Sequence, residues 1–226
     1  MIDPTLKYAQ GYINERRFQW TLCLAVSALF APNFTSAQQT EARQPNVALS
    51  HFTGLSAYTA TGFQSGSVHL DNVRIRNTPY NVQAPNYHST GTPWLIGLNY
   101  TYVFKNNVSV GAQVDFFPVS KQMALSLTPG FQFNEKILGY LKLGWVHAPS
   151  TVDQGPGRKA YDVNLNGLVA GLGAKYLFTK NLYGFLEVNA VQFQKLNFTS
   201  WQGPIPIEGS ATTRAQNLLL GLGYRF

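Results

Sequence analysis

Four histidines are the side chains best suited to acid–base or nucleophilic catalysis in this chain: His51, His69, His88 and His147. A serine or threonine nucleophile needs a histidine base within hydrogen-bond reach. His88 comes nearest to this arrangement, in His88-Ser89-Thr90, but the triplet lies in a Gly-, Ser- and Asn-rich stretch that is typical of a loop. Histidines in loops are far more often solvated than catalytic, so we predict that the chain is not an enzyme.

Metal and cofactor chemistry have no support in the residue spacing. The chain has one cysteine, Cys23, and no Cys/His pair or metal-ligand spacing. It also has no Gly-rich phosphate-binding loop. The net charge is +7, but the basic residues are dispersed, without a Lys/Arg run or a basic helix. We therefore expect no cofactor, no metal and no nucleic-acid partner. We expect the positive net charge to attract the protein mildly to anionic lipid headgroups.

Five charged residues occupy a different setting, inside runs in which every second residue is apolar. Asp115 lies between Val114 and Phe116, and Lys142 has a leucine on either side. Successive side chains of a β-strand point to opposite faces, so these charges point away from the apolar face. A charge buried in a low-dielectric interior is very costly unless it is paired. We therefore predict a buried network, bridged by amides and water, of Asp115, Lys142, Lys175, Glu187 and Arg225.

The last nine residues indicate the kind of structure that holds these charges. Every second residue is apolar, in the order Leu218, Leu220, Leu222, Tyr224 and Phe226. The residues between them are small or polar, apart from Leu219. A period of two predicts a β-strand, and an apolar face that ends on aromatics is typical of a strand lying against lipid. Taken alone, the segment is also compatible with the closing strand of a soluble sandwich.

Three further stretches repeat this alternation, each as two strands joined by three polar residues. They cover residues 94–116, 123–145 and 168–193, with turns at 105–107, 134–136 and 179–181. Two such strands joined by a few turn residues form a hairpin. The first strand of each pair ends on an aromatic directly before its turn. We expect these aromatic residues to lie at the membrane boundaries, together with Trp94: Phe104, Phe133, Phe178 and Trp94.

The other connections are mostly longer and irregular, over residues 63–92, 117–122, 148–162 and 194–213. Short turns on one side and longer loops on the other are typical of outer-membrane barrels. A weakly alternating first strand near residues 51–60 brings the count to eight. An even count lets the first and last strands pair, which removes exposed sheet edges. We therefore predict an all-β fold, a closed eight-stranded antiparallel transmembrane β-barrel over residues 51–226.

The composition agrees with a barrel that faces lipid. Only 12% of the residues are charged, while 14% are aromatic. This balance is unusual for a soluble enzyme and ordinary for a barrel with an apolar outer surface. No apolar run reaches the ~20 residues that a membrane-spanning helix needs. The length fits one domain.

The start of the chain has the features of a secretory signal peptide. Arg16-Arg17 precede an apolar stretch over residues 18–30, and Thr35-Ser36-Ala37 places small residues at a cleavage site. We predict a signal peptide with a lead-in over residues 1–37 and a periplasmic tail over residues 38–50. Cys23 lies inside the apolar stretch, so the mature chain contains no cysteine, as suits an exported protein that needs no disulfide.

The stretch from about Trp94 to Phe226 resembles the small outer-membrane β-barrel family that includes Omp25/Omp31-type proteins, opacity-type proteins and the OmpA barrel domain. The resemblance is carried by Ile96–Tyr100, Val108–Phe116, Leu168–Phe178 with its turn, the strand around Glu187, and Gly221–Phe226. It implies a location in the bacterial outer membrane, among lipid and lipopolysaccharide. It also implies that the barrel-insertion machinery recognises the C-terminal strand through Leu222, Tyr224 and Phe226.

These observations predict a structural or surface-interaction protein of the outer membrane, with a surface partner bound through the loops. An eight-stranded barrel is narrow enough for side chains to fill, so the charged network is expected to keep the lumen closed. One alternative is a narrow porin-like channel, opened when a salt bridge exchanges partners. A less favoured alternative is a lipid A-modifying enzyme, since fold alone never determines function.

Overall fold

A computed structural model describes residues 50–82, 86–152, 159–202 and 205–226. The predicted signal peptide, and all but the last residue of the predicted tail, lie outside the described residues. Among the described residues, no helix has the length and hydropathy needed to cross a membrane. The described chain forms the strands β1 (Gly54–Ile75), β2 (Tyr87–Gly91), β3 (Trp94–Val103), β4 (Val108–Phe117), β5 (Gln122–Leu127), β6 (Gly130–Gln132), β7 (Ile137–Val152), β8 (Tyr161–Leu177), β9 (Leu182–Phe193), β10 (Leu196–Gln202) and β11 (Ile205–Arg225).

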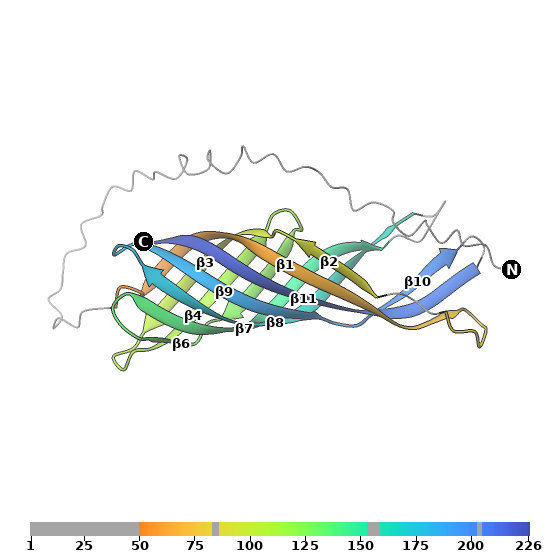
Figure 1. The fold of residues 1–226 in the computed structure, drawn as a ribbon, viewed down its shortest axis with the longest axis horizontal. Coiled ribbons are helices and arrows are strands. Elements are labelled where there is room, and N and C mark those ends of the chain that lie inside the picture. The colour runs from red at the N-terminus through yellow and green to blue at the C-terminus, as the bar shows by residue number, and fades with distance from the viewer. Residues whose placement is uncertain (1–49, 83–85, 153–158, 203–204) are drawn as a thin grey trace. The chain divides into compact units, whose positions relative to one another are not determined.

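Antiparallel pairing closes these strands into a ring (Figure 1). Its order is β1, β3, β4, β5 with β6, β7, β8, β9 and β11, and β11 pairs with β1 from Ser56↔Arg225 onward. β5 and β6 act as one strand of the ring, because both pair with β4 on one side and β7 on the other. Pro129 interrupts them, since proline has no backbone N–H to donate to the ladder. The predicted closed eight-stranded barrel is therefore confirmed.

The alternating sequence produces two different surfaces. Along β4, exposed and buried residues alternate without a break, with Val110 and Val114 outside and Gln113 and Asp115 inside. The same alternation continues on β5, on β9 from Phe185 onward and on the second half of β11. The outside is therefore an apolar band, as lipid requires, and the polar side chains are confined to the lumen.

Pairs of aromatic residues lie on the outer surface at one end of the barrel. Four pairs at positions i and i+2 make edge-to-face contacts: Tyr102–Phe104, Phe131–Phe133, Tyr176–Phe178 and Tyr224–Phe226, with ring centroids 4.9–5.6 Å apart. This end carries the short turns and the C-terminus, which by the usual asymmetry of such barrels is the periplasmic side. Trp94 starts β3 at the opposite end, where its indole Nε1 donates to Thr59 Oγ1 at 3.0 Å. Edge-to-face pairs are a favourable arrangement of aromatic rings.

The first predicted loop, over residues 63–92, is wrong for much of its length. β1 continues to Ile75, and its second half pairs with β11 as far as Ile75↔Ile207. His88 lies on β2, which pairs with β1 over Gln64–Val68. Residues 64–67 of β1 are Gln-Ser-Gly-Ser and lack the hydrophobic period that marks a strand, and the register shift between Asp71 and Arg74 breaks the alternation again. Backbone pairing with β11 supplies the order instead.

Two more predicted loops are shorter than expected for the same reason. β7 and β8 extend to Val152 and Tyr161, so most of residues 148–162 that are described belong to strands. β10 and the start of β11 form a hairpin in place of the predicted loop 194–213, paired from Leu196↔Ala211 to Gln202↔Ile205. In Figure 1 this hairpin lies at the end of the barrel opposite the C-terminus. We call the parts of β1, β10 and β11 that lie farthest from the C-terminus (residues 69–75, 196–202 and 205–211) the external sheet.

Candidate functional site

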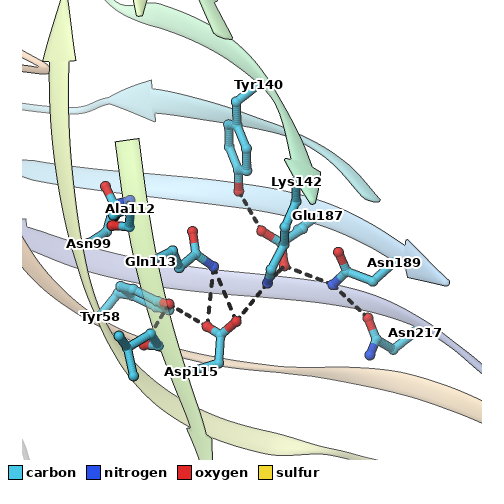
Figure 2. Close-up of polar contacts among 11 residues, drawn as sticks. Tyr58, Asn99, Ala112, Gln113, Asp115, Tyr140, Lys142, Glu187, Asn189 and Asn217 are labelled. Carbon is cyan, nitrogen blue, oxygen red and sulfur yellow. Dashed lines mark hydrogen bonds and ion pairs between the residues drawn. The ribbon is translucent and has the colours of Figure 1, made fainter. Parts of the chain in front are cut away.

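The centre of the lumen holds one lysine between two carboxylates. Lys142 Nζ lies 2.7 Å from Asp115 Oδ2 and 2.8 Å from Glu187 Oε1. The three side chains come from β7, β4 and β9, and each is at most 2% exposed. Figure 2 shows the ammonium group placed between the two acids. Each residue is an inward position of an alternating strand, and the strand register places the three side chains at the same level of the barrel.

Asp115 is held by two further donors. The Tyr58 hydroxyl on β1 donates to Asp115 Oδ1, and Gln113 Nε2 approaches both carboxylate oxygens, at 3.2 and 3.4 Å. Together with Lys142, these groups occupy both oxygens of the carboxylate (Figure 2). Charge-assisted hydrogen bonds of this kind are about twice as strong as neutral ones.

Glu187 has a matching set of donors. The Tyr140 hydroxyl donates to Glu187 Oε2 at 2.8 Å, and Asn189 Nδ2 donates to Glu187 Oε1 at 2.8 Å. Asn189 Nδ2 also donates to Asn217 Oδ1 at 2.9 Å, which extends the network to β11. Each acid is therefore bonded to Lys142, one tyrosine and one amide. We call Asp115, Lys142 and Glu187 with these donors the lumen cluster.

Lys175 lies beside the lumen cluster without contacting a carboxylate. Its Nζ donates to Asn99 Oδ1 at 2.7 Å and lies 5.4 Å from the ring centroids of both Tyr140 and Tyr183. Aromatic faces attract a cation through their quadrupole, more strongly when the cation is desolvated. Lys175 is therefore held by a neutral amide and two aromatic rings, whereas Lys142 is the lysine that pairs with both acids.

Arg225 does not join the other four predicted network residues. Its Nη1 donates to the Thr53 carbonyl at 2.9 Å, near the short-turn end of the barrel. Leu219 is the residue of β11 that pairs with Glu187, and Arg225 lies six positions beyond it. At about 3.3 Å per residue, this separates Arg225 from the lumen cluster by about 20 Å along the strand. The prediction placed Arg225 on the correct, inward face of the strand. It did not include the position of Arg225 along the barrel axis, which separates it from the other charges.

Three tyrosines of the lumen were missed as partners of the charges. Tyr58, Tyr140 and Tyr183 are buried, and the Tyr183 hydroxyl donates to Ser56 Oγ at 3.1 Å. Each ring lies across a glycine that is its direct cross-strand partner: Tyr58↔Gly97, Tyr140↔Gly173 and Tyr183↔Gly223. The signal in the sequence was the presence of glycines at inward positions, where a missing Cβ leaves room for a neighbouring ring.

Apolar side chains fill the lumen on both sides of the cluster. Toward the short turns these are Phe52, Val103, Leu138 and Leu177, and toward the opposite end they are Ala124, Val146, Val169, Val191 and Phe193. The void bordered by Tyr58, Gln113, Tyr140 and Lys175 has no room for a water molecule. Around the lumen cluster, the described side chains therefore pack without a void that would hold water.

Replacing Lys175 with methionine is expected to change the free energy of unfolding by less than about 1 kcal/mol. Methionine fills a similar volume, and removing a buried cation that has no carboxylate partner also removes its desolvation cost. Asn99 Oδ1 keeps a donor, because Thr101 Oγ1 also bonds to it at 2.7 Å. Urea unfolding of the refolded protein, followed by gel mobility, measures this change. A loss of about 3 kcal/mol or more would show that Lys175 is an essential partner of the acids.

Two of the four histidines, His69 and His147, contact other side chains. His69 contacts Asp71 Oδ1 through Nε2 at 3.0 Å and Asn86 Oδ1 through Nδ1 at 2.5 Å. His147 stacks on Trp145, and its Nδ1 lies 3.0 Å from Asn166 Oδ1. Within the described ranges, no histidine is hydrogen-bonded to a serine or threonine hydroxyl.

A closed ring of strands with an apolar outer band and a charged lumen defines a transmembrane β-barrel. The family model of the outer membrane protein beta-barrel domain matches residues 21–226, and the chain belongs to that family. It is accordingly a protein of the bacterial outer membrane.

Solved structures with a similar arrangement share little sequence with this chain. Ail of Yersinia pestis is 18% identical, covers 77% of this chain and 99% of its own, and has a TM-score of 0.43. OprG of Pseudomonas aeruginosa is 12% identical over 78% and 97%, with a TM-score of 0.43. The N-terminal β-barrel domain of OprF, from the same organism, is 15% identical over 77% and 98%, with a TM-score of 0.40. A comparison with curated protein sequences found no match.

Proposed function

We propose that this protein is a closed, non-enzymatic barrel that anchors a surface-interaction site in the outer membrane. The observation that carries the proposal is the position of Lys142, buried between Asp115 and Glu187 at the centre of the lumen. A barrel whose axis is blocked by a paired, desolvated charge cluster is suited to support its external strands. It is poorly suited to passing solutes.

The energetic argument against free conduction rests on the same contacts. A water path through the centre requires Lys142 to leave at least one carboxylate, and separating a buried ion pair costs several kcal/mol. Tyr58 and Tyr140 would also have to give up their hydrogen bonds to Asp115 and Glu187. These costs favour the closed lumen over the alternative of a narrow porin-like channel.

The external sheet is the part of the molecule available to a partner. β1 and β11 remain paired to Ile75↔Ile207, and β10 adds a third strand to them. Strands give such a surface a fixed shape, whereas a long irregular loop would have to be ordered on binding. The rigid barrel below holds this sheet in the membrane. The predicted surface partner of the loops is therefore reassigned to these strands.

Planar-bilayer recording tests the closed lumen. We expect the refolded protein to give no reproducible channel openings, with heat-modifiable gel mobility as the evidence that it is folded. The variant Asp115→Ala/Lys142→Ala/Glu187→Ala removes the charged side chains at the centre but leaves the apolar side chains on both sides of them, so we expect it to stay silent as well. Lys136→Ala, in an exposed turn, serves as the control and is expected to be silent. Reproducible openings of the wild type that change with Asp115→Asn would replace this proposal with the channel.

A further inference from the structure

The external sheet has an open edge, formed by residues 196–200 of β10. These residues pair with β11, and in the part of the chain that the structure describes no strand pairs with them on the other side. β9, which precedes them, pairs with β8 as far as Gly167↔Phe193. One further bond joins Gln194 N to the Asn166 carbonyl at 2.7 Å. Beyond this bond, β10 leaves the barrel wall with one edge free.

The opposite edge of the external sheet is covered by the chain itself. β1 lies at that edge, and residues 80–82 fold back along it. Ile75 N donates to the Tyr80 carbonyl at 3.2 Å, and Val82 N donates to the Val73 carbonyl at 2.7 Å. The two edges of the sheet therefore differ, since a returning segment occupies one of them and the other is open.

The open edge has none of the features that usually protect an exposed strand. Natural edge strands are commonly blocked by charged residues, prolines or bulges, because their unpaired N–H and C=O groups attract another strand. Residues 196–200 contain no charge and no proline. Their pairing with β11 runs from Leu196↔Ala211 to Ser200↔Ile207 without a register shift. This edge is therefore a template for the addition of a strand.

The hydrogen bonds of β11 identify the backbone groups that this edge offers. Along an antiparallel strand, successive residues direct their N–H and C=O groups to opposite sides. The Pro206 carbonyl accepts from Arg76 N at 2.9 Å, so Pro206 points toward β1 and away from β10. The residues two and four positions further along β11 point the same way, and their partners on β10 are Thr199 and Asn197. Thr199 and Asn197 therefore direct their backbone groups to the open edge.

This edge is complementary to a second copy of itself in the antiparallel direction. With a two-fold axis at Phe198, Asn197 of each copy lies opposite Thr199 of the other, and each of these two pairs exchanges two backbone hydrogen bonds. Leu196 of each copy lies opposite Ser200 of the other. Because residues 196–200 are uncharged, no like charges meet across the axis.

The two copies of Phe198 meet at the centre of this arrangement. They occupy the closely spaced, non-hydrogen-bonded position, where aromatic side chains pack favourably. Within one copy, Phe198 packs over Gly209 and Val73, since a Cβ added to Gly209 would lie 3.0 Å from Phe198 Cζ and 3.1 Å from Val73 Cγ2. Phe198 is only partly buried, so its ring has surface left for a second ring.

The symmetry of this pairing determines where the second barrel lies. Two identical antiparallel strands in one sheet are related by a two-fold axis perpendicular to that sheet. β1 and β11 continue from the barrel wall into the external sheet (Figure 1), and the wall contains the direction of the barrel axis. The rotation therefore reverses the barrel axis, which places the second barrel in an opposed membrane.

We infer that β10 binds β10 of a second copy in an opposed membrane, through antiparallel pairing of residues 196–200. The inference rests on the proposed function, because it identifies the partner of the external sheet. One pair of strands joins only ten residues in total. Many copies in two facing membranes bind together, however, and this multivalency raises the overall affinity.

Clustering of vesicles that contain the refolded protein tests this pairing. Vesicles reconstituted from detergent hold the protein in both orientations, so part of the external sheets face outward. Light scattering measures clustering, and heat-modifiable gel mobility shows that each variant is folded. We expect wild-type vesicles to cluster. Thr199→Pro removes an N–H group that points away from β11, so two hydrogen bonds are lost per pair of copies, and we expect clustering to slow about tenfold or more.

Asn81→Pro is the matched control on the covered edge. Tyr80 and Val82 bond to β1, so the N–H group of Asn81 between them points away from β1. Asn81 is exposed, as an edge residue of the same external region. We expect its vesicles to cluster like the wild type.

A disulfide test identifies both the register and the opposed membranes. A Cys23→Ser background removes the one cysteine of the chain. Asn197→Cys in one vesicle population and Thr199→Cys in another are expected to form a mixed disulfide-linked dimer, since opposite Cα atoms lie about 5.5 Å apart. Either population alone is expected to form at least tenfold less dimer. Its cysteines are two residues out of register, about 8 Å apart, beyond the reach of a disulfide.

The inference is overturned if wild-type vesicles do not cluster, if Thr199→Pro clusters like the wild type, or if the mixed disulfide forms only when both variants share one vesicle. Any of these results with a wild type that stays silent in bilayers leaves the closed-barrel proposal standing. Conduction by the wild type would overturn that proposal separately.

Discussion

Replacing Lys142 with methionine is expected to lower the free energy of unfolding by about 3–5 kcal/mol, the cost of leaving a buried ion-pair partner uncompensated. Two acids would remain where there was one shared cation, since Lys142 Nζ bonds to Asp115 at 2.7 Å and to Glu187 at 2.8 Å. The remaining donors are two tyrosines and two amides, which are neutral. They leave both negative charges without a cation in direct contact.

Neutralising all three groups together separates the loss of charge balance from the loss of packing. The variant Asp115→Asn/Lys142→Met/Glu187→Gln keeps the approximate shape of the cluster and removes every charge. Because replacing a buried ion pair as a unit is often close to neutral, we expect this variant to regain most of the stability that Lys142→Met loses. This recovery would show that Lys142→Met is destabilising because it leaves two acids without a cation. It would also show that the three charges together add little net stability to the fold.

Urea unfolding in lipid vesicles, followed by gel mobility, measures both variants. Lys136→Met is the control, because Lys136 is exposed in a turn and its side chain makes no ion pair or hydrogen bond among the described residues. We expect its unfolding to match the wild type within about 0.5 kcal/mol, as for most surface substitutions. A Lys142→Met protein as stable as this control would mean that water or a rearranged Lys175 compensates the two acids.

The sequence predicted the membrane-embedded part of the barrel well, because lipid imposes a period of two on it. Strands such as β4 and β9 have one apolar and one polar face, and their bounds follow directly from that contrast. The alternation breaks in β1 at residues 64–67 and at the register shift between Asp71 and Arg74, and in β11 at Pro206 and Gly209. These parts of β1 and β11 were therefore predicted as loops.

The sequence allowed the buried charged residues to be predicted, but not the neutral side chains that donate hydrogen bonds to them. Asp115, Lys142 and Glu187 stand out because a charge at an inward position must be paired. Arg225 satisfied the same criterion, but its height in the barrel depends on strand register, which alternation alone does not determine. The tyrosines that donate to the acids were missed because an inward aromatic in a strand is read most simply as packing.

Inward glycines explain how these tyrosines reach the charges. Tyr58, Tyr140 and Tyr183 each lie across a glycine of the next strand, and Phe185 lies across Gly221 in the same way. A ring that lies flat over a glycine covers its backbone and directs its outer edge along the lumen wall. These glycines therefore make room for the rings beside the lumen cluster, although they carry no functional group.

Replacing Gly173 with alanine is accordingly expected to lower the free energy of unfolding by about 3 kcal/mol, from overpacking and a weakened charged hydrogen bond. The added Cβ would lie 2.5 Å from both Tyr140 Cζ and Tyr140 Oη, and 3.0 Å from the Leu186 carbonyl oxygen. Tyr140 must therefore move, and its bond to Glu187 Oε2 is disturbed. Gly91→Ala is the matched control, because nothing lies within 4 Å of a Cβ added there.

A double-mutant cycle with Tyr140→Ala identifies the cause of this loss. Once the ring is absent, Gly173→Ala is expected to cost less than about 0.5 kcal/mol, because alanine fits a strand at least as well as glycine. The coupling energy between the two positions is then most of the single-variant effect. An equal loss in both backgrounds would assign the cost to the Leu186 carbonyl and the backbone of β9. A loss confined to the background with the ring would establish that Gly173 serves to place the Tyr140 hydroxyl on Glu187.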